Sequence, residues 1–140
     1  MAVFGAGVIA LELGQALHRL GVRVRLFGRS LRTGPITDPG VLQSAEKVFS
    51  SEFPFTAPVK VENVEPDENG VRVLYRNNED SGVEEEVFEQ VLAATGRDPN
   101  LTELNLEQTS LKLDSRGIPV YNPLTMQCGN SPVFIAGDVN

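Results

Sequence analysis

The sequence predicts an α/β fold, in which a Rossmann-like parallel sheet with flanking helices carries a three-stranded antiparallel meander. Two observations support this prediction. Residues 1–51 alternate short apolar runs with segments of helical spacing, as a parallel sheet with crossover helices does. Residues 59–88 contain three runs of strand character that only short turn sequences separate, which favours hairpins.

The first half of the chain is expected to hold two strands and two helices. A short apolar run ends at a Gly-Ala-Gly turn, and the next segment places Ile9, Leu13 and Leu17 on one helical face until Gly21 stops it. A run that alternates apolar residues with arginines follows, which is the strand pattern. The expected elements are a strand at 2–4, a helix at 8–20, a strand at 22–27 and a helix at 41–51.

Strands are expected to dominate the second half. The sequence Asp-Glu-Asn-Gly at 67–70 and the polar stretch at 77–82 are typical of hairpin turns. Proline and asparagine punctuate the stretch that precedes the last apolar run. The expected strands lie at 59–64, 71–75, 83–88, 90–94 and 133–136.

Composition excludes several classes of protein. The chain has 140 residues, enough for one globular domain with its own core. Its single cysteine excludes a disulfide scaffold, a redox dithiol and a cysteine-based zinc site within these residues. A net charge of −7 argues against nucleic acid as a partner. No apolar run approaches the ~18 residues that span a bilayer, so the composition predicts a cytoplasmic protein without a membrane partner.

The Gly-Ala-Gly turn carries the first candidate chemistry. Gly5 and Gly7, with Ala10 three residues later, form a G-x-G-x-x-A pattern between a predicted strand and a predicted helix. Gly5 would permit the tight turn, Gly7 would let a pyrophosphate approach the backbone, and Ala10 would let the helix pack closely on the sheet. The unpaired N–H groups of the helix would face the phosphates. The alternative is a tight turn without a ligand.

The end of the second strand is expected to contact the adenosine ribose of the coenzyme. NAD sites place an acid there, about 20 residues after the glycines, to accept from the 2′-hydroxyl. This sequence has no acid between Glu12 and Asp38, whereas Arg29 and Ser30 stand just beyond the strand. A guanidinium and a hydroxyl suit the 2′-phosphate of NADP. The alternative is that the arginines near this strand are simply exposed.

Three segments together carry a family resemblance. They are Phe-Gly-Ala-Gly-Val-Ile-Ala-Leu-Glu-Leu-Gly at 4–14, Ala-Ala-Thr-Gly-Arg-Asp-Pro-Asn at 93–100 and Phe-Ile-Ala-Gly-Asp-Val at 134–139. In this order the set resembles the FAD-dependent pyridine nucleotide–disulfide oxidoreductases, and the residues of the motifs are most similar to those of the dihydrolipoamide dehydrogenases. The resemblance covers the whole chain. It implies a NAD(P)-binding domain at 1–97 and, at 98–140, a return segment that joins the FAD domain of a longer parent enzyme.

The resemblance implies contacts with the nicotinamide dinucleotide near the first helix. Gly5, Gly7, Val8 and Ile9 would line the pyrophosphate. Glu12 would reach the nicotinamide end from the exposed face of the helix. The alternative for Glu12 is compensation of the helix dipole in the first turn.

Further positions are implied along the rest of the chain. Val61 matches a position beside the adenine, although a valine of the strand core is an equal interpretation. Gly96 would pass near the nicotinamide coenzyme, and Asp138 would accept a hydrogen bond from a ribityl hydroxyl of FAD. Gly28 stands where dihydrolipoamide dehydrogenases have a glutamate, so the choice between NAD and NADP stays open.

The implied function is to position NAD(P) for hydride transfer with FAD in an oxidoreductase of dihydrolipoamide dehydrogenase type. The first FAD fingerprint, the redox disulfide and the dimer domain of such enzymes do not occur in these residues. We therefore expect an inactive fragment whose partners are the dinucleotide and the rest of the parent chain, and whose exposed leucines permit self-association. Two alternatives stay open: a related flavoenzyme without a disulfide, of the NADH oxidase or ferredoxin reductase type, and a non-catalytic nucleotide-binding module.

Overall fold

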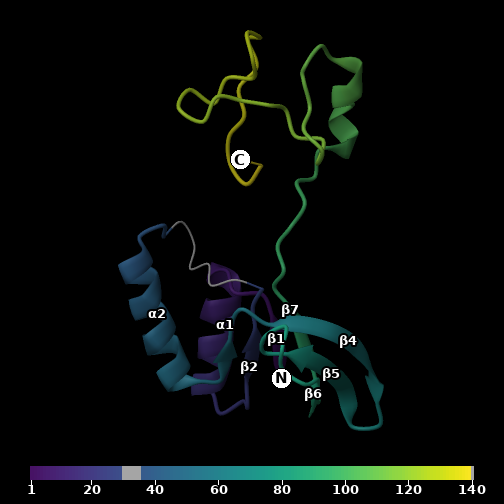
Figure 1. Ribbon diagram of the computed structural model, residues 1–140. Coiled ribbons are helices and arrows are strands. Elements are labelled where there is room, and N and C mark those ends of the chain that lie inside the picture. Colours follow the sequence, from purple (N-terminus) through teal and green to yellow (C-terminus); the bar gives the residue numbers. More distant parts are fainter. Residues whose placement is uncertain (30–35, 140) are drawn as a thin grey trace. The chain divides into compact units, whose positions relative to one another are not determined.

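A computed structural model describes residues 1–29 and 36–139. The chain divides into two compact units, Met1–Gly96 and Arg97–Asn140, which we call unit 1 and unit 2. The strands and α-helices, most of them labelled in Figure 1, belong to unit 1. They are β1 (Ala2–Phe4), α1 (Val8–Arg19), β2 (Arg25–Phe27), α2 (Pro39–Glu52), β3 (Phe55–Thr56), β4 (Lys60–Asp67), β5 (Gly70–Arg76), β6 (Glu84–Phe88) and β7 (Val91–Ala93).

A four-stranded parallel sheet forms the centre of unit 1. Its strand order is β3-β2-β1-β7, and β1 pairs in parallel with both β2 and β7. Phe4 lies opposite Phe27 on one side and opposite Ala93 on the other, so the three strands end at the same edge. This is the edge at which open α/β sheets bind their ligands.

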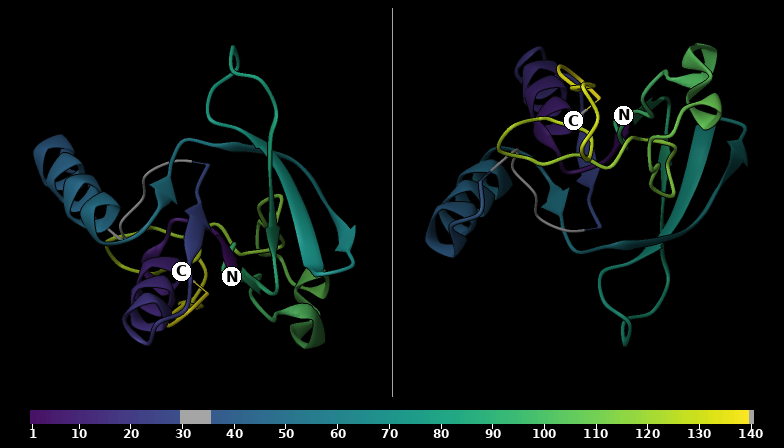
Figure 2. Two further views of the ribbon diagram at one scale, coloured as in Figure 1. Left: turned by 90° about the horizontal axis from the view of Figure 1, so that it is seen from below. Right: turned by 90° about the horizontal axis from the view of Figure 1, so that it is seen from above.

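The two helices cover one face of the parallel sheet (Figure 2). Alternate strand residues point to opposite faces, and Val3 and Leu26 point to the helical side. They pack in one buried cluster with Ala10 of α1 and with Phe53, which follows α2. The spacing of Ile9, Leu13 and Leu17 predicted the helix but not its buried face: α1 buries Ala10, Leu11 and Gly14, whereas Ile9 and Leu13 are nearly half exposed. α2 has no buried residue and contributes Phe49 at the margin of the same cluster.

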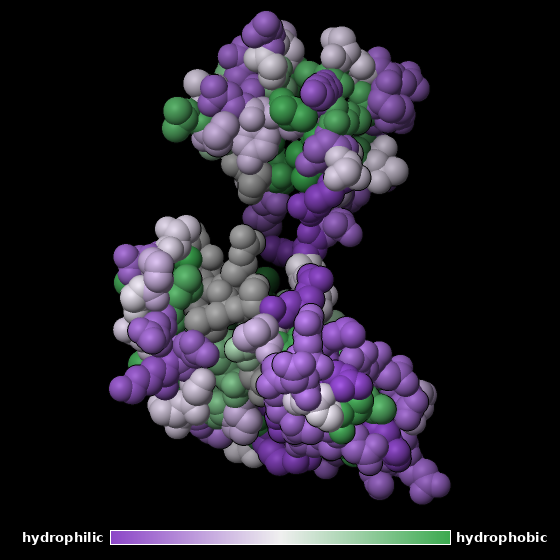
Figure 3. Space-filling view, in the orientation of Figure 1, coloured by the Kyte–Doolittle hydropathy of each residue, from purple (hydrophilic) through white to green (hydrophobic). Residues whose placement is uncertain are grey.

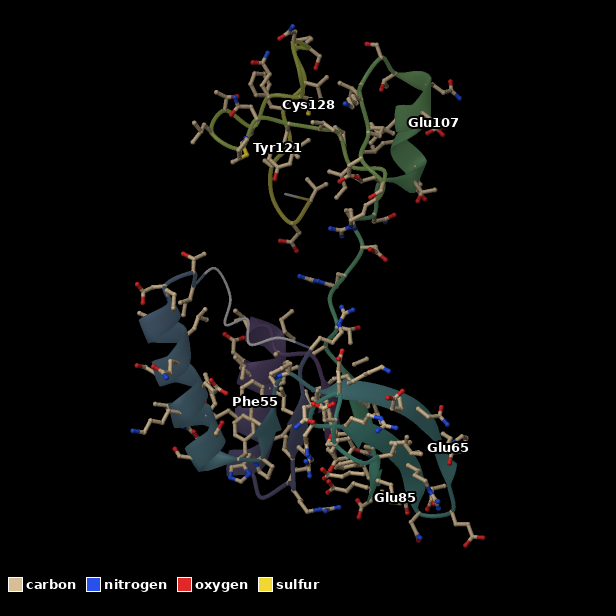
Figure 4. The ribbon with its side chains drawn as sticks, viewed as in Figure 1. Phe55, Glu65, Glu85, Glu107, Tyr121 and Cys128 are labelled. Carbon is tan, nitrogen blue, oxygen red and sulfur yellow. The ribbon has the colours of Figure 1, made fainter. Side chains whose placement is uncertain are left out.

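The antiparallel meander covers the other face. Strands β4, β5 and β6 pair in sequence order, and their apolar residues meet those that the parallel sheet presents on that side. The ring of Phe27 packs edge-on against Tyr75 and Phe88, with centroids 5.1 and 5.8 Å apart. The surface over the meander is largely hydrophilic (Figure 3), and Glu65 and Glu85 project from it (Figure 4).

Unit 2 contains turns and two short 3₁₀ helices, Thr102–Leu104 and Leu106–Gln108. Its core consists of Ile118, Cys128 and Ile135, with Tyr121 packed against it (Figure 4). The single cysteine is buried in this core.

The predicted α/β class with its meander is confirmed, but several elements differ, and β4 runs three residues beyond the strand predicted at 59–64. The predicted strand at 22–27 is wrong over its first half, because β1 has only three residues and can pair only with Arg25–Phe27. The predicted strand at 133–136 is wrong: Phe134 makes a single bridge to Gln127, and no described neighbour extends the ladder. The short edge strand β3, which pairs with the end of β2, was missed.

Candidate functional site

The candidate site is the edge at which β1, β2 and β7 end. Backbone hydrogen bonds align the residues that follow these strands. The amide of Gly5 donates to the carbonyl of Phe27 over 2.9 Å, and the amide of Ala94 donates to the carbonyl of Phe4 over 2.8 Å. The segments after β1, β2 and β7 therefore leave the sheet side by side, with Gly7 and Arg29 on neighbouring segments.

The fold itself requires glycine at position 5. Its φ of +126° is a conformation that side chains disfavour, and a Cβ at this position would lie 2.3 Å from the carbonyl oxygen of Ala94. The turn after β1 can therefore pass beside β7 only with glycine. This contact explains Gly5 without a ligand.

Gly7 has a different environment. Its φ of −77° suits any residue, and a Cβ placed there would meet no described atom within 4 Å. Neither backbone strain nor packing accounts for glycine at this position. What glycine provides is bare backbone that faces open space at the first turn of α1.

The first turn of α1 is uncapped and apolar. Gly7 is the N-cap and makes no side-chain hydrogen bond to the helix, and the first turn holds no acid. The first N–H groups of a helix have no partner within it, and the helix dipole adds partial positive charge there. Val8 and Ile9 are nearly half exposed beside these groups. The arrangement suits an anion that approaches the backbone directly.

Glu12 lies one turn further along α1 and is exposed. Because it lies outside the first turn, compensation of the helix dipole explains it poorly. Ile9 is three residues before it and Leu13 one after, both nearly half exposed. Residues three and four apart share a helical face, so an apolar strip with one carboxylate extends from the uncapped first turn along α1.

Most arginines of the predicted cluster near β2 have structural roles. Arg23 and Arg25 both pair with Glu86 of the meander, at 2.8 and 3.0 Å, and the Arg25 guanidinium lies 4.7 Å from the ring centre of Tyr75. Burial raises the pKa of Tyr75, and the charge of Arg25 opposes this shift. These side chains tie the parallel sheet to the meander, as simple structural residues would.

Arg19 is also engaged away from the candidate site. It binds Glu52 of α2 at 2.6 Å, and this hydrogen bond, with a second from Gln15, lowers the pKa of Glu52 below its usual value. Arg29, in contrast, is exposed at the site edge. Ser30, which was predicted beside it, lies outside the described residues.

The remaining predicted positions are divided between the units. Gly96 follows β7 and is exposed at the same edge as Gly7. Val61 pairs with Tyr75 and packs on the core between the sheet and the meander, which supports its interpretation as a core valine. Asp138 belongs to unit 2, where its exposed carboxylate lies 3.3 Å from Arg97.

Unit 2 contains a cavity of about 620 Å³. Its lining is mostly apolar and includes Leu101, Leu111 and Ile135, with Arg97 and Asp138 at its polar side. Sequence reasoning placed Asp138 near a ligand but did not foresee this cavity. Ile118 contributes to the core of unit 2.

No helix among the described residues is long and apolar enough to cross a membrane. Within residues 1–29 and 36–139, no group of three or more His, Cys, Asp or Glu side chains is arranged to hold a metal ion.

The chain is similar to curated proteins over almost its whole length. The chain is 34% identical over 140 residues to a mercuric reductase of Staphylococcus aureus and 31% identical to a dihydrolipoyl dehydrogenase of Thermus scotoductus. Each alignment covers 99% of this chain and 25% or 30% of the relative. The chain thus spans less than a third of the length of these curated relatives.

Solved structures share the fold. LpdA from Mycobacterium tuberculosis superposes with a TM-score of 0.72 at 22% identity, over 99% of this chain and 29% of that one. The flavoprotein disulfide reductase RclA from Escherichia coli, as a Cu(II) complex, gives 0.70 at 19% identity, over 99% and 30%. The family model described as pyridine nucleotide-disulphide oxidoreductase matches residues 1–140. The chain therefore belongs to the pyridine nucleotide-disulphide oxidoreductase family.

Proposed function

We propose that unit 1 binds a nicotinamide dinucleotide at the edge formed by β1, β2 and β7 and positions it for hydride transfer with FAD, within an oxidoreductase of dihydrolipoamide dehydrogenase type. The observation that carries the proposal is Gly7. The fold does not require glycine there, whereas a pyrophosphate against the backbone would. Family membership supports the same interpretation.

Different residues along this edge would contact different parts of the coenzyme. The N–H groups after Gly7 would bind the pyrophosphate, with Val8 and Ile9 beside it. From there the apolar strip along α1 would lead to Glu12, whose carboxylate would accept hydrogen bonds at the nicotinamide end. Gly96 would let the chain pass close to the coenzyme. Val61 would stand beside the adenine only if the coenzyme reaches the rim of the meander core.

Asp138 is the residue proposed for FAD. Its exposed carboxylate, at the polar side of the cavity in unit 2, has the acceptor chemistry that a ribityl hydroxyl needs. When bound, FAD supplies the redox chemistry, and this chain supplies orientation, which makes the transfer effectively intramolecular. The only cysteine is buried, so these 140 residues provide no dithiol. We therefore propose that this chain alone binds coenzyme but shows no diaphorase activity with added FAD.

The test is calorimetric titration of the chain with NADH and NADPH. Gly7→Ala is expected to weaken binding about tenfold or more, because the added methyl group displaces the pyrophosphate from the backbone. Gly82→Ala is the matched control, since a Cβ there also meets open space, away from the site. Both variants should stay folded, and Gly7→Ala should lower the free energy of unfolding by no more than about 1 kcal/mol, because alanine is a poorer N-cap than glycine. Absence of binding by the folded chain, or equal binding by Gly7→Ala, would refute the proposal.

A further inference from the structure

The turn between β4 and β5 holds the only Asn-Gly pair of the sequence, and the proposed coenzyme site does not use it. Asp67 pairs with Gly70 across the hairpin, so Glu68 and Asn69 form a two-residue connection. Both connecting residues are exposed to solvent. Asn-Gly is a common hairpin sequence, which accounts for the turn. The same pair is chemically reactive, because an asparagine side chain and the next backbone nitrogen can close a ring.

The reaction takes place within two adjacent residues. The backbone nitrogen of Gly70 forms a bond to Cγ of Asn69, the bond from Cγ to Nδ2 breaks, and ammonia leaves with the proton of the attacking nitrogen. Water then opens the resulting succinimide at either of its two carbonyl groups. One product is aspartate. The other is isoaspartate, in which the main chain continues through Cβ and Cγ, so the overall change consumes only water.

The surroundings of Asn69 leave this reaction open. Its backbone amide donates to Oδ1 of Asp67 over 3.0 Å, and Asp67 also binds Arg72 at 2.6 Å. These contacts hold the backbone of the turn. In the described part of the chain, no hydrogen bond holds the side-chain amide of Asn69. Gly70 has no side chain that could shield its nitrogen, so Cγ of Asn69 is free to approach it.

Two other asparagines have protection that Asn69 lacks. The backbone nitrogen that follows Asn130 donates to a backbone carbonyl over 3.2 Å and is therefore occupied. The nitrogen of Val64 donates to Oδ1 of Asn63 over 2.9 Å, so the reacting groups already meet there. The branched side chain of valine crowds that nitrogen, however, and hinders the attack. Asn69 combines a free side chain with an unshielded nitrogen.

The two products differ in their effect on the meander. A Cβ at Gly70 would lie 2.3 Å from the carbonyl oxygen of Phe88 and 2.8 Å from Cα of Glu89, so the turn packs directly against the end of β6. Aspartate keeps the length of the main chain. Isoaspartate adds a main-chain atom between Asp67 and Gly70, and the close contact with β6 leaves no room for it. The pairing of β4 with β5 must then shift.

We propose that Asn69 is a site of spontaneous deamidation, and that isoaspartate at this position weakens the pairing of β4 with β5. The inference goes beyond the proposed function and does not depend on it, since the reaction needs only water and the fold of unit 1. Val73 and Tyr75 of β5 lie in one buried cluster with Phe27 of the parallel sheet. A shift of β5 would therefore disturb the contact between the meander and that sheet.

The first experiment incubates the 140-residue chain at mildly alkaline pH and follows each asparagine by peptide mass mapping. Deamidation appears as the small mass gain of an amide that becomes an acid, and chromatography separates the two products. In the folded chain, Asn69 should react at least about tenfold faster than Asn130. Its rate should also lie within about tenfold of its rate in the urea-unfolded chain. Asn69→Gln should remove the fast reaction, because the larger ring closes more slowly.

The second experiment measures what each product does to stability. Freshly prepared Asn69→Asp has the charge of the product without the longer main chain, and its urea midpoint should stay close to that of the unchanged chain. The isoaspartate form, purified after incubation, should unfold at lower urea concentration. Its hydrogen exchange should accelerate in β4 and β5. Asn69→Gln, incubated for the same time, is the control and should show neither change.

Each part of the proposal has its own contrary result. A reaction at Asn69 no faster than at Asn130, or a folded-state rate more than about tenfold below the unfolded-state rate, would show that the turn protects Asn69 and would overturn the site. An isoaspartate form as stable as Asn69→Asp would overturn the effect on the meander. Coenzyme titration has no part in either measurement, so these results are distinct from the test of the proposed function.

Discussion

Different kinds of interaction stabilise the folded structures of unit 1 and unit 2. Unit 1 has paired strands, two helices and two buried clusters that contain aromatic rings. Unit 2 has isolated bridges, 3₁₀ turns and a core of three buried apolar residues. Its surface interleaves hydrophobic and polar residues (Figure 3), with Leu104 and Phe134 exposed by 61% and 60%.

The turns of unit 2 rely on short side chains that bind the backbone. Oδ1 of Asp114 accepts from the amides of Arg116 and Ile118, at 2.8 and 2.9 Å. Asn122 accepts from the amide of Leu124 at 2.8 Å in the same way. In unit 1, by contrast, strand ladders and packing determine the backbone. Substitutions should therefore act through steric fit in unit 1 and through single hydrogen bonds in unit 2.

Gly5→Ala should produce the largest effect. The added Cβ would lie 2.3 Å from the carbonyl oxygen of Ala94, and the φ of +126° would be strained. We expect a loss of at least about 3 kcal/mol in the free energy of unfolding of unit 1, measured by urea denaturation. A loss below about 1 kcal/mol would mean that the turn can move away from β7, and that packing does not fix this corner.

Asp114→Ala should have an intermediate effect confined to unit 2. Two backbone amides lose their acceptor, at a cost of about 1–3 kcal/mol in the opening of that turn. Hydrogen exchange should accelerate for the amides of 116–118 and stay unchanged in β5. Asp114→Asn keeps the Oδ1 acceptor and should retain protection. Faster exchange throughout unit 1 would show that the two units do not open independently.

Gly14→Ala should produce the smallest effect, and in the opposite direction. A Cβ there would lie 3.7 to 3.9 Å from Leu26, Val24 and Phe53, which is ordinary contact distance. Helix propensity favours alanine, so we expect unit 1 to gain about 0.5–1 kcal/mol in thermal or urea unfolding. Gly21→Ala, in open space but at φ +89°, should instead destabilise. Destabilisation by Gly14→Ala would show that α1 packs more tightly than these distances imply.

The sequence was informative where local pattern and tertiary packing agree. The spacing of apolar residues predicted α1, a second helix was expected at 41–51, and the turn sequences separated the strands of the meander. Strand length was poorly predicted, because the number of paired residues in β2 depends on β1 and not on its own alternation. The two-residue β3 was missed because a pair this short has no period to detect.

The candidate site was predicted in outline. The glycine pattern located Gly7 and the strand end located Arg29, since both rest on residues close in sequence. The roles of Arg23 and Arg25 could not be predicted, because Glu86 is more than 60 residues away and no local signal links them. The ion pair between Arg97 and Asp138 within unit 2 could not be predicted either, because the two residues are far apart in the sequence. The cytoplasmic location and self-association of this chain remain predictions.

The pairing of β1 with β7 has a consequence for biosynthesis. Of the strands described, β1 leaves the ribosome first and lies inside the sheet, yet its amide at Ala2 bonds to the carbonyl of Gln90, which is made almost last in unit 1. The apolar β1 must therefore stay without that neighbour while residues 5–90 are translated. During this interval it is a natural target for chaperones. In a circular permutant of unit 1 that begins with β7, β1 would spend less time without this neighbour during translation.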